Sequence, residues 1–155
     1  MMIWLPLHSF AQSEGGPQSS TSIHDESDFL GFTTSSPPIM TFSTPADYQN
    51  GKFSDAPSSI VLTLGLAWTV SVRAATANLT SGTNTIAISN VTVQVVGASF
   101  GTGVITLTTN NQTIASGVLA LLANFNFRYT MKGGTHLLKP AGDYTATVIF
   151  STTGL

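Results

Sequence analysis

Histidine is the residue type best suited to acid–base or metal chemistry near neutral pH, and this 155-residue sequence has three, at positions 8, 24 and 136. Only His136 lies in the strand-rich part of the sequence, just before the last strand. No serine, histidine and aspartate together have the strand–turn–helix context of a nucleophile elbow, and there is no cysteine. We therefore expect no catalytic residue and no enzyme, and we predict that His136 is an exposed turn residue.

One run of residues has the side chains of a metal site, at His24-Asp25-Glu26-Ser27-Asp28. It lacks the glycine at the turn and the distal glutamate of a calcium-binding loop. We interpret it as a solvated acidic run and expect no metal and no cofactor.

Carbohydrate binding would use exposed aromatic side chains. Trp68 is in phase with a row of aliphatic residues, which indicates a core position. Tyr129 follows Phe125 and Phe127 at a spacing of two, and we expect it to be buried as well. Tyr48, in a turn-rich segment beside Asn50, is the one candidate contact for a ligand.

The composition is poor in charge and rich in hydroxyl groups. Charged residues make up 8 % and hydrophobic residues 42 %, while the sequence contains 23 threonines and 18 serines. Such a surface is typical of extracellular β proteins, because threonine favours strands and serine favours turns. The sequence has no basic stripe of the kind that would indicate nucleic acid as a partner. No apolar run in it reaches the roughly 18–20 residues of a membrane span.

The sequence divides into three segments. Residues 1–11 resemble the end of a secretory signal, with an apolar stretch and then Ser9-Phe10-Ala11 as a cleavage site. Residues 12–38 form an extended arm rich in serine, threonine and proline, which cannot build a core alone. Residues 39–155 form the β-sandwich domain. Residues 1–39 contain four acidic residues and no lysine or arginine. The arm is therefore either a solvated tail or an acidic segment that docks on the weakly basic body.

Alternating apolar residues predict strands throughout the body. One phase runs from Ile60 to Val72, and Gly65 within it predicts a bend, a bulge or a tight hairpin. Pro45 to Lys52 is predicted as a loop with a turn at Asn50-Gly51. The phase slips near Ser89-Asn90, which requires a bulge or a change of sheet. Residues 118–125 fit a helix or a strand, and the longer match favours the strand.

The last strand begins after a turn at Pro140-Ala141-Gly142-Asp143, and Tyr144 opens it. A tyrosine in this place resembles the tyrosine corner of immunoglobulin-like sandwiches, where it begins the next-to-last strand. Only five residues follow Phe150. The predicted fold is therefore an all-β, immunoglobulin-like antiparallel sandwich with an extended N-terminal arm and without its own final strand.

Four segments together resemble small secreted bacterial β-sandwich proteins of the pilin-like, fimbrial-subunit kind, and they lie at residues 42–51, 68–74, 88–93 and 139–148. The segment Lys139-Pro140-Ala141-Gly142-Asp143-Tyr144 is similar to the terminal strand of such proteins. The resemblance implies a bacterial cell-surface location and assembly into filaments. It departs from many fimbrial subunits in having no cysteine pair.

From the sequence we expect a structural subunit that polymerises with copies of itself, because an incomplete sandwich exposes a sheet edge that a neighbour's arm can fill. The expected anchors on the arm are apolar: Phe29, Leu30, Phe32, Ile39 and Met40. The alternative is a secreted monomeric binding module for glycans or a cell surface, with the arm as a linker.

Overall fold

The structure is a computed structural model, and it describes residues 2–4, 7–8, 30–34, 38–62, 67–118 and 122–154. Residues 9–29, which include most of the arm and the expected anchor Phe29, lie outside the described residues. The strands are Met2–Trp4 (β1), Leu7–His8 (β2), Leu30–Thr34 (β3), Ile39–Thr41 (β4), Gly51–Leu62 (β5), Ala67–Ala74 (β6), Asn78–Ser81 (β7), Asn84–Ala87 (β8), Val91–Val96 (β9), Ile105–Thr106 (β10), Gln112–Val118 (β11), Leu122–Lys132 (β12), Asp143–Thr145 (β13) and Val148–Gly154 (β14). Within the described ranges, three short helices join them: Pro45–Asn50 (α1), Ile88–Asn90 (η1) and Thr135–Leu137 (η2).

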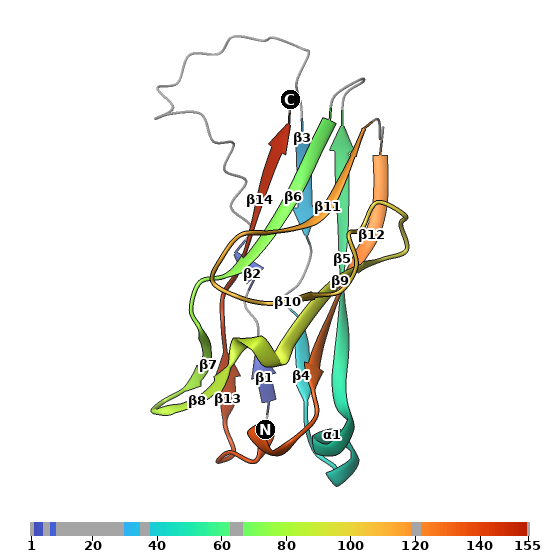
Figure 1. Ribbon diagram of the computed structural model, residues 1–155. Coiled ribbons are helices and arrows are strands. Elements are labelled where there is room, and N and C mark those ends of the chain that lie inside the picture. The colour runs from blue at the N-terminus through green and yellow to red at the C-terminus, as the bar shows by residue number, and fades with distance from the viewer. Residues whose placement is uncertain are drawn as a thin grey trace.

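The strands form an all-β, sandwich-like fold, as the sequence predicts (Figure 1). One sheet has the order β10-β9-β12-β5-β3, and the opposite layer consists of the sheets β4-β1-β13-β7-β8 and β11-β6-β14-β2. These last two sheets follow one another because only two residues separate β13 from β14. Figure 1 shows α1 and β1 toward one end of the elongated molecule, and the C-terminal end of β14 at the other.

Alternation along the strands builds the core between the layers. On β6, Trp68, Val70, Val72 and Ala74 are buried, and on β12 every second residue from Phe125 to Met131 is buried. The sequence-based predictions for Trp68 and Tyr129 are confirmed, since they are 3 % and 0 % exposed.

A chain of aromatic rings crosses the core from one layer to the other. Trp68 meets Phe100 edge to face, Phe100 meets Phe125 in the same way, and Phe125 meets Phe127. Phe127 then stacks on Phe150 of β14, with ring centroids 4.6 Å apart. These are the offset and edge-to-face geometries that aromatic pairs prefer, so the chain holds β12 against β6 and β14.

The structure differs from the sequence-based expectation in the segment before β6. The phase from Ile60 to Val72 divides into β5 and β6, and Gly65 lies outside the described residues. β5 begins earlier, at Gly51, and includes Pro57. Pro57 is the register partner of Asn126 on β12, and β3 pairs with the next residues of β5, 58–62.

The phase slip at Ser89-Asn90 is a change of sheet. β8 lies in the sheet with β7, while β9 pairs with β12 in the opposite layer. The single turn of η1 joins them, and residues 118–125 contain the end of β11 and the start of β12 rather than a described helix.

Candidate functional site

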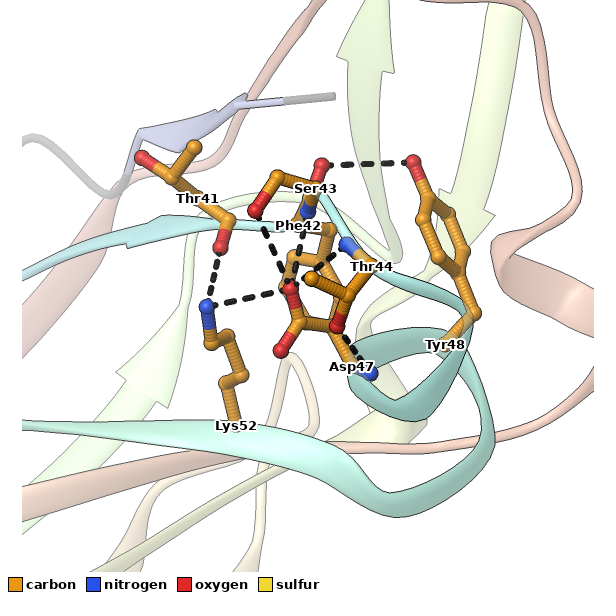
Figure 2. A network of polar contacts seen from close by, with 7 residues as sticks. All are labelled: Thr41, Phe42, Ser43, Thr44, Asp47, Tyr48 and Lys52. Atoms are coloured by element: carbon orange, nitrogen blue, oxygen red, sulfur yellow. Dashed lines mark hydrogen bonds and ion pairs between the residues drawn. The ribbon is translucent and has the colours of Figure 1, made fainter.

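The segment around Asp47 contains the densest set of polar contacts among the described residues. Asp47 Oδ2 accepts hydrogen bonds from the backbone amides of Ser43 and Thr44, at 2.8 and 2.9 Å (Figure 2). Lys52 Nζ lies 3.2 Å from the same oxygen and donates to the carbonyl of Thr41 at 2.6 Å. The two amides, together with Lys52, hold the pKa of the Asp47 carboxyl well below its ordinary value.

These contacts explain why α1 forms where the sequence predicts a loop. The Thr44 hydroxyl caps the helix by accepting a hydrogen bond from the Asp47 amide, and Pro45 occupies the first turn. The Asp47 carboxylate in turn accepts a hydrogen bond from the Thr44 amide. This arrangement is a capping box. The sequence contains its spacing, a threonine followed three residues later by an acidic residue, at Thr44-Pro45-Ala46-Asp47. Gly51, at φ 77°, ends the helix and begins β5.

A hollow of about 650 Å³ opens beside α1, and we call it the α1–η2 hollow. Ser43, Thr44, Pro45, Tyr48 and Gln49 line it on the helix side. Gly134, Thr135 and Leu138 line the opposite wall. Tyr48, the candidate ligand contact from the sequence, therefore lies in a concave site.

Two glycines fix the distance between these walls. A Cβ atom on Gly133 would lie 2.1 Å from the carbonyl oxygen of Gln49, and one on Gly51 would lie 2.1 Å from that of Met131. The Gly134 amide also donates to the carbonyl of Tyr48 at 2.8 Å. The end of β12 and the end of α1 thus meet backbone to backbone.

The expected arm anchors occupy sheet edges of their own chain. Leu30 and Phe32 lie on β3, where they are register partners of Leu62 and Ile60 on β5. Ile39 and Met40 lie on β4 next to β1. Ile39 is 43 % exposed, whereas Met40 is buried in the core.

The C-terminal strand has a neighbour from the start of the chain. β1 pairs with β13 and β2 pairs with β14, and both pairings are parallel, whereas every other described pairing is antiparallel. Residues 2–4 and 7–8 therefore lie beside the C-terminal segment of the chain. Of the six outer positions in the described sheets, β2, β3 and β4 occupy three.

Tyr144 is fully buried at the start of this strand. Its hydroxyl donates to the carbonyl of Pro140, four residues upstream, at 3.0 Å. This is the bond that defines a tyrosine corner.

The candidates for chemistry are dispersed. His136 is half-buried in η2, where its Nε2 lies 2.8 Å from the carbonyl oxygen of Lys132. His24 and its acidic neighbours lie outside the described residues. Residues 97–101 have the bare Gly-x-Ser-x-Gly spacing of a nucleophile elbow, but Ser99 lies in a turn between β9 and β10, and Phe100 belongs to the aromatic chain.

A paired charge lies on the surface of β5 and β12. Arg128 makes two hydrogen bonds of 2.8 Å to the Asp55 carboxylate, and its guanidinium lies 4.3 Å from the centre of the Phe53 ring. The pair lowers the pKa of Asp55 and raises that of Arg128. Asp55 and Arg128 are register partners, so this partly exposed pair links β5 and β12 across the sheet surface.

No helix among the described residues is both long enough and apolar enough to cross a membrane. No protein-family model matches the sequence, and no curated protein matches it either. The α1–η2 hollow and the edges of the sheets are therefore interpreted from their geometry.

Proposed function

We propose that this protein is a structural subunit of a bacterial extracellular filament or surface layer, in which copies join head to tail. The observation that carries the proposal is the parallel pairing of β1 with β13 and of β2 with β14. It indicates that the edge of the C-terminal strand accepts a strand from the N-terminal part of a chain. A neighbour's strand can form the same kind of backbone hydrogen bonds.

The arm supplies the donor. In a secreted form from which residues 1–11 have been removed, the edge beside β13 and β14 is uncovered and the arm is free at its N-terminal side. Leu30–Thr34 is already extended and already an edge strand. Since Met40 is buried in its own core, the donated part is Leu30–Thr34 rather than β4.

Such a contact joins two different surfaces of neighbouring copies. A contact of this kind does not close on itself and makes a fibre. The hydroxyl-rich, charge-poor composition supports an extracellular location for that fibre.

The test replaces residues 2–8 with glycine and serine, keeping the length of the chain. We expect the purified variant to form filaments in electron micrographs, and the unmodified chain to stay monomeric because its own residues cover the edge. The matched control replaces residues 14–20 in the same way, which belong to no described strand.

Adding Leu30→Ser and Phe32→Ser to the first variant should abolish the filaments, because the donor then loses its apolar side chains. Filaments of normal length from this combined variant would contradict the donor role of β3. A 2–8 replacement that stays folded and monomeric would contradict the acceptor role of the β13–β14 edge.

A second candidate function is a secreted monomeric binding module. The observation that favours it is that β1, β2 and β3 cover the edges of β13, β14 and β5 within one chain. Light scattering on the secreted protein from its native host discriminates, since a monodisperse monomer that has lost residues 1–11 supports the module.

A further inference from the structure

We infer that the α1–η2 hollow is a binding site for a neutral carbohydrate. The inference goes beyond assembly and gives the binding-module candidate a defined site, and it holds for a monomer and for a polymerised subunit alike. A volume of about 650 Å³ is within the range of ligand pockets and would accept one or two sugar rings.

The hollow is built rigidly enough to bind without first being ordered. The capping box fixes the start of α1, and the backbone contacts of Gly51 and Gly133 fix its end against β12. Two contacts fix Tyr48. Its backbone carbonyl accepts a hydrogen bond from the Gly134 amide, and the centroid of its ring lies 5.7 Å from that of the Phe42 ring. A preformed wall saves the entropy that ordering a loop on binding would cost.

The charge of the site selects a neutral ligand. None of the residues that line the hollow carries a charge. The Asp47 carboxylate accepts hydrogen bonds from the amides of two lining residues, Ser43 and Thr44, and lies 3.2 Å from Lys52 Nζ. Lys52 in turn donates to Thr41, so this ion pair offers little attraction to an added ion.

The lining of the hollow is mainly apolar, which suits one kind of surface that a pyranose ring presents. Pro45, Tyr48 and Leu138 offer apolar area, and Leu138 is 69 % exposed although it is a large aliphatic residue. A sugar ring has a face of C–H groups that packs on such area. Ligand pockets are lined mainly by apolar and aromatic side chains, as this hollow is.

Polar groups around this apolar area can meet the sugar's hydroxyls. The side chains of Gln49 and Thr135 lie on opposite walls, both are exposed, and neither makes a hydrogen bond with another residue in the described ranges. An amide and a hydroxyl each donate and accept, as a sugar hydroxyl does.

The test is a titration of the ¹⁵N-labelled full-length chain with lactose, cellobiose and diacetylchitobiose, followed by two-dimensional NMR. We expect at least one disaccharide to give saturable shifts at the amides of Tyr48, Gln49, Thr135 and Leu138. Sialyllactose and glucuronic acid are the charged comparisons. We expect glucuronic acid, which has no neutral sugar attached, to give no shift at these amides.

Two variants test the assignment from opposite walls of the hollow. Tyr48→Ala and Leu138→Ser should each weaken binding by about tenfold, the loss typical of a truncated central contact. Leu138→Ser keeps the test valid if Tyr48→Ala does not fold, because Leu138 is largely exposed. Val104→Ala, at another exposed apolar residue, should leave the affinity unchanged.

Three results would overturn the inference. The first is an absence of shifts at these amides with all three neutral probes at millimolar concentration. The second is binding that both variants leave intact. The third is a shift of the same amides on raising the protein concentration without sugar, which would assign the hollow to a second copy of the chain. None of these results depends on filament formation, so failure here is separate from failure of the assembly proposal.

Discussion

Tyr144 and Tyr129 are both fully buried tyrosines, but their hydroxyls have opposite surroundings. Tyr144 donates to the carbonyl of Pro140, whereas the hydroxyl of Tyr129 has no partner in the described part of the chain. Burial raises the pKa of Tyr129 far above its ordinary value, so this hydroxyl stays protonated. Tyr144 is therefore a stabilising polar contact, and the Tyr129 hydroxyl costs free energy.

We expect Tyr144→Phe to lower the free energy of unfolding by about 1 kcal/mol, because it removes a net-favourable hydrogen bond. Tyr129→Phe should leave the free energy of unfolding unchanged or raise it, because it removes a hydroxyl without a partner. Urea unfolding of the two variants measures the difference. Equal losses in both would contradict the tyrosine corner as a stabilising feature.

The Asp47 carboxylate should make the free energy of unfolding depend on pH in the acidic range. Its pKa is lowered in the folded state from the model-compound value of 3.8, so the carboxylate stabilises the fold at neutral pH. That contribution is complete above the unfolded-state pKa and is lost as the pH falls toward the lower folded-state pKa. We expect Asp47→Asn to be less stable than the unmodified protein at pH 7, and the gap to narrow below about pH 4.

Urea unfolding between pH 2 and 7 checks this dependence on Asp47. Asp55→Asn is the matched control, because Asp55 also has a lowered pKa but is paired with Arg128 on the open strand surface rather than with backbone amides. A gap between Asp47→Asn and the unmodified protein that stays constant with pH would contradict the role of the carboxylate.

At the scale of the elements, the join between α1 and β12 depends on the absence of side chains. Gly133 is not in the left-handed region, so crowding alone decides its substitution. We expect Gly133→Ala to lower the free energy of unfolding by about 1–3 kcal/mol, because its Cβ would meet the backbone of Gln49.

Gly82→Ala separates this crowding from a general effect of glycine replacement. Gly82 has φ 57° and open space around it, so an alanine there strains only its own backbone. NMR spectra should show shifted amides at Tyr48 and Gln49 in Gly133→Ala and unshifted ones in Gly82→Ala. Unshifted amides in both would contradict the close contact at the α1–η2 hollow.

The periodicity of the sequence predicted the elements well where a strand has one buried face. Trp68, Val70 and Val72 point inward, as their spacing indicates, and Tyr129 follows the same rule on β12. The rule does not say where two strands of the same phase divide. The sequence therefore marked a bend, a bulge or a hairpin at Gly65 but did not give the ends of β5 and β6. α1 was missed because six residues are too short to show a helical period, although its capping box was present.

At the scale of the whole molecule, the aromatic chain from Trp68 to Phe150 joins the two layers. We expect Phe127→Ala to lower the free energy of unfolding by about 3–5 kcal/mol, because it leaves a cavity between β12 and β14. Phe53→Ala removes the same side chain at a position 59 % exposed, and it should cost about 1 kcal/mol or less, from its contact with Arg128. Thermal unfolding followed by circular dichroism compares the two, and similar losses would contradict a core centred on the aromatic chain.

The sequence by itself determined the all-β class, the buried faces of the strands and the turn that places Tyr144, because local spacing and turn residues encode each of these. It also marked Tyr48, but not the hollow in which Tyr48 lies. Only the tertiary structure decided that hollow, because its walls come from residues 43–49 and 134–138, which lie far apart in the sequence. It also decided which edges β1, β2 and β3 cover, because edge pairing uses backbone groups that nearly every residue carries and that no sequence pattern distinguishes.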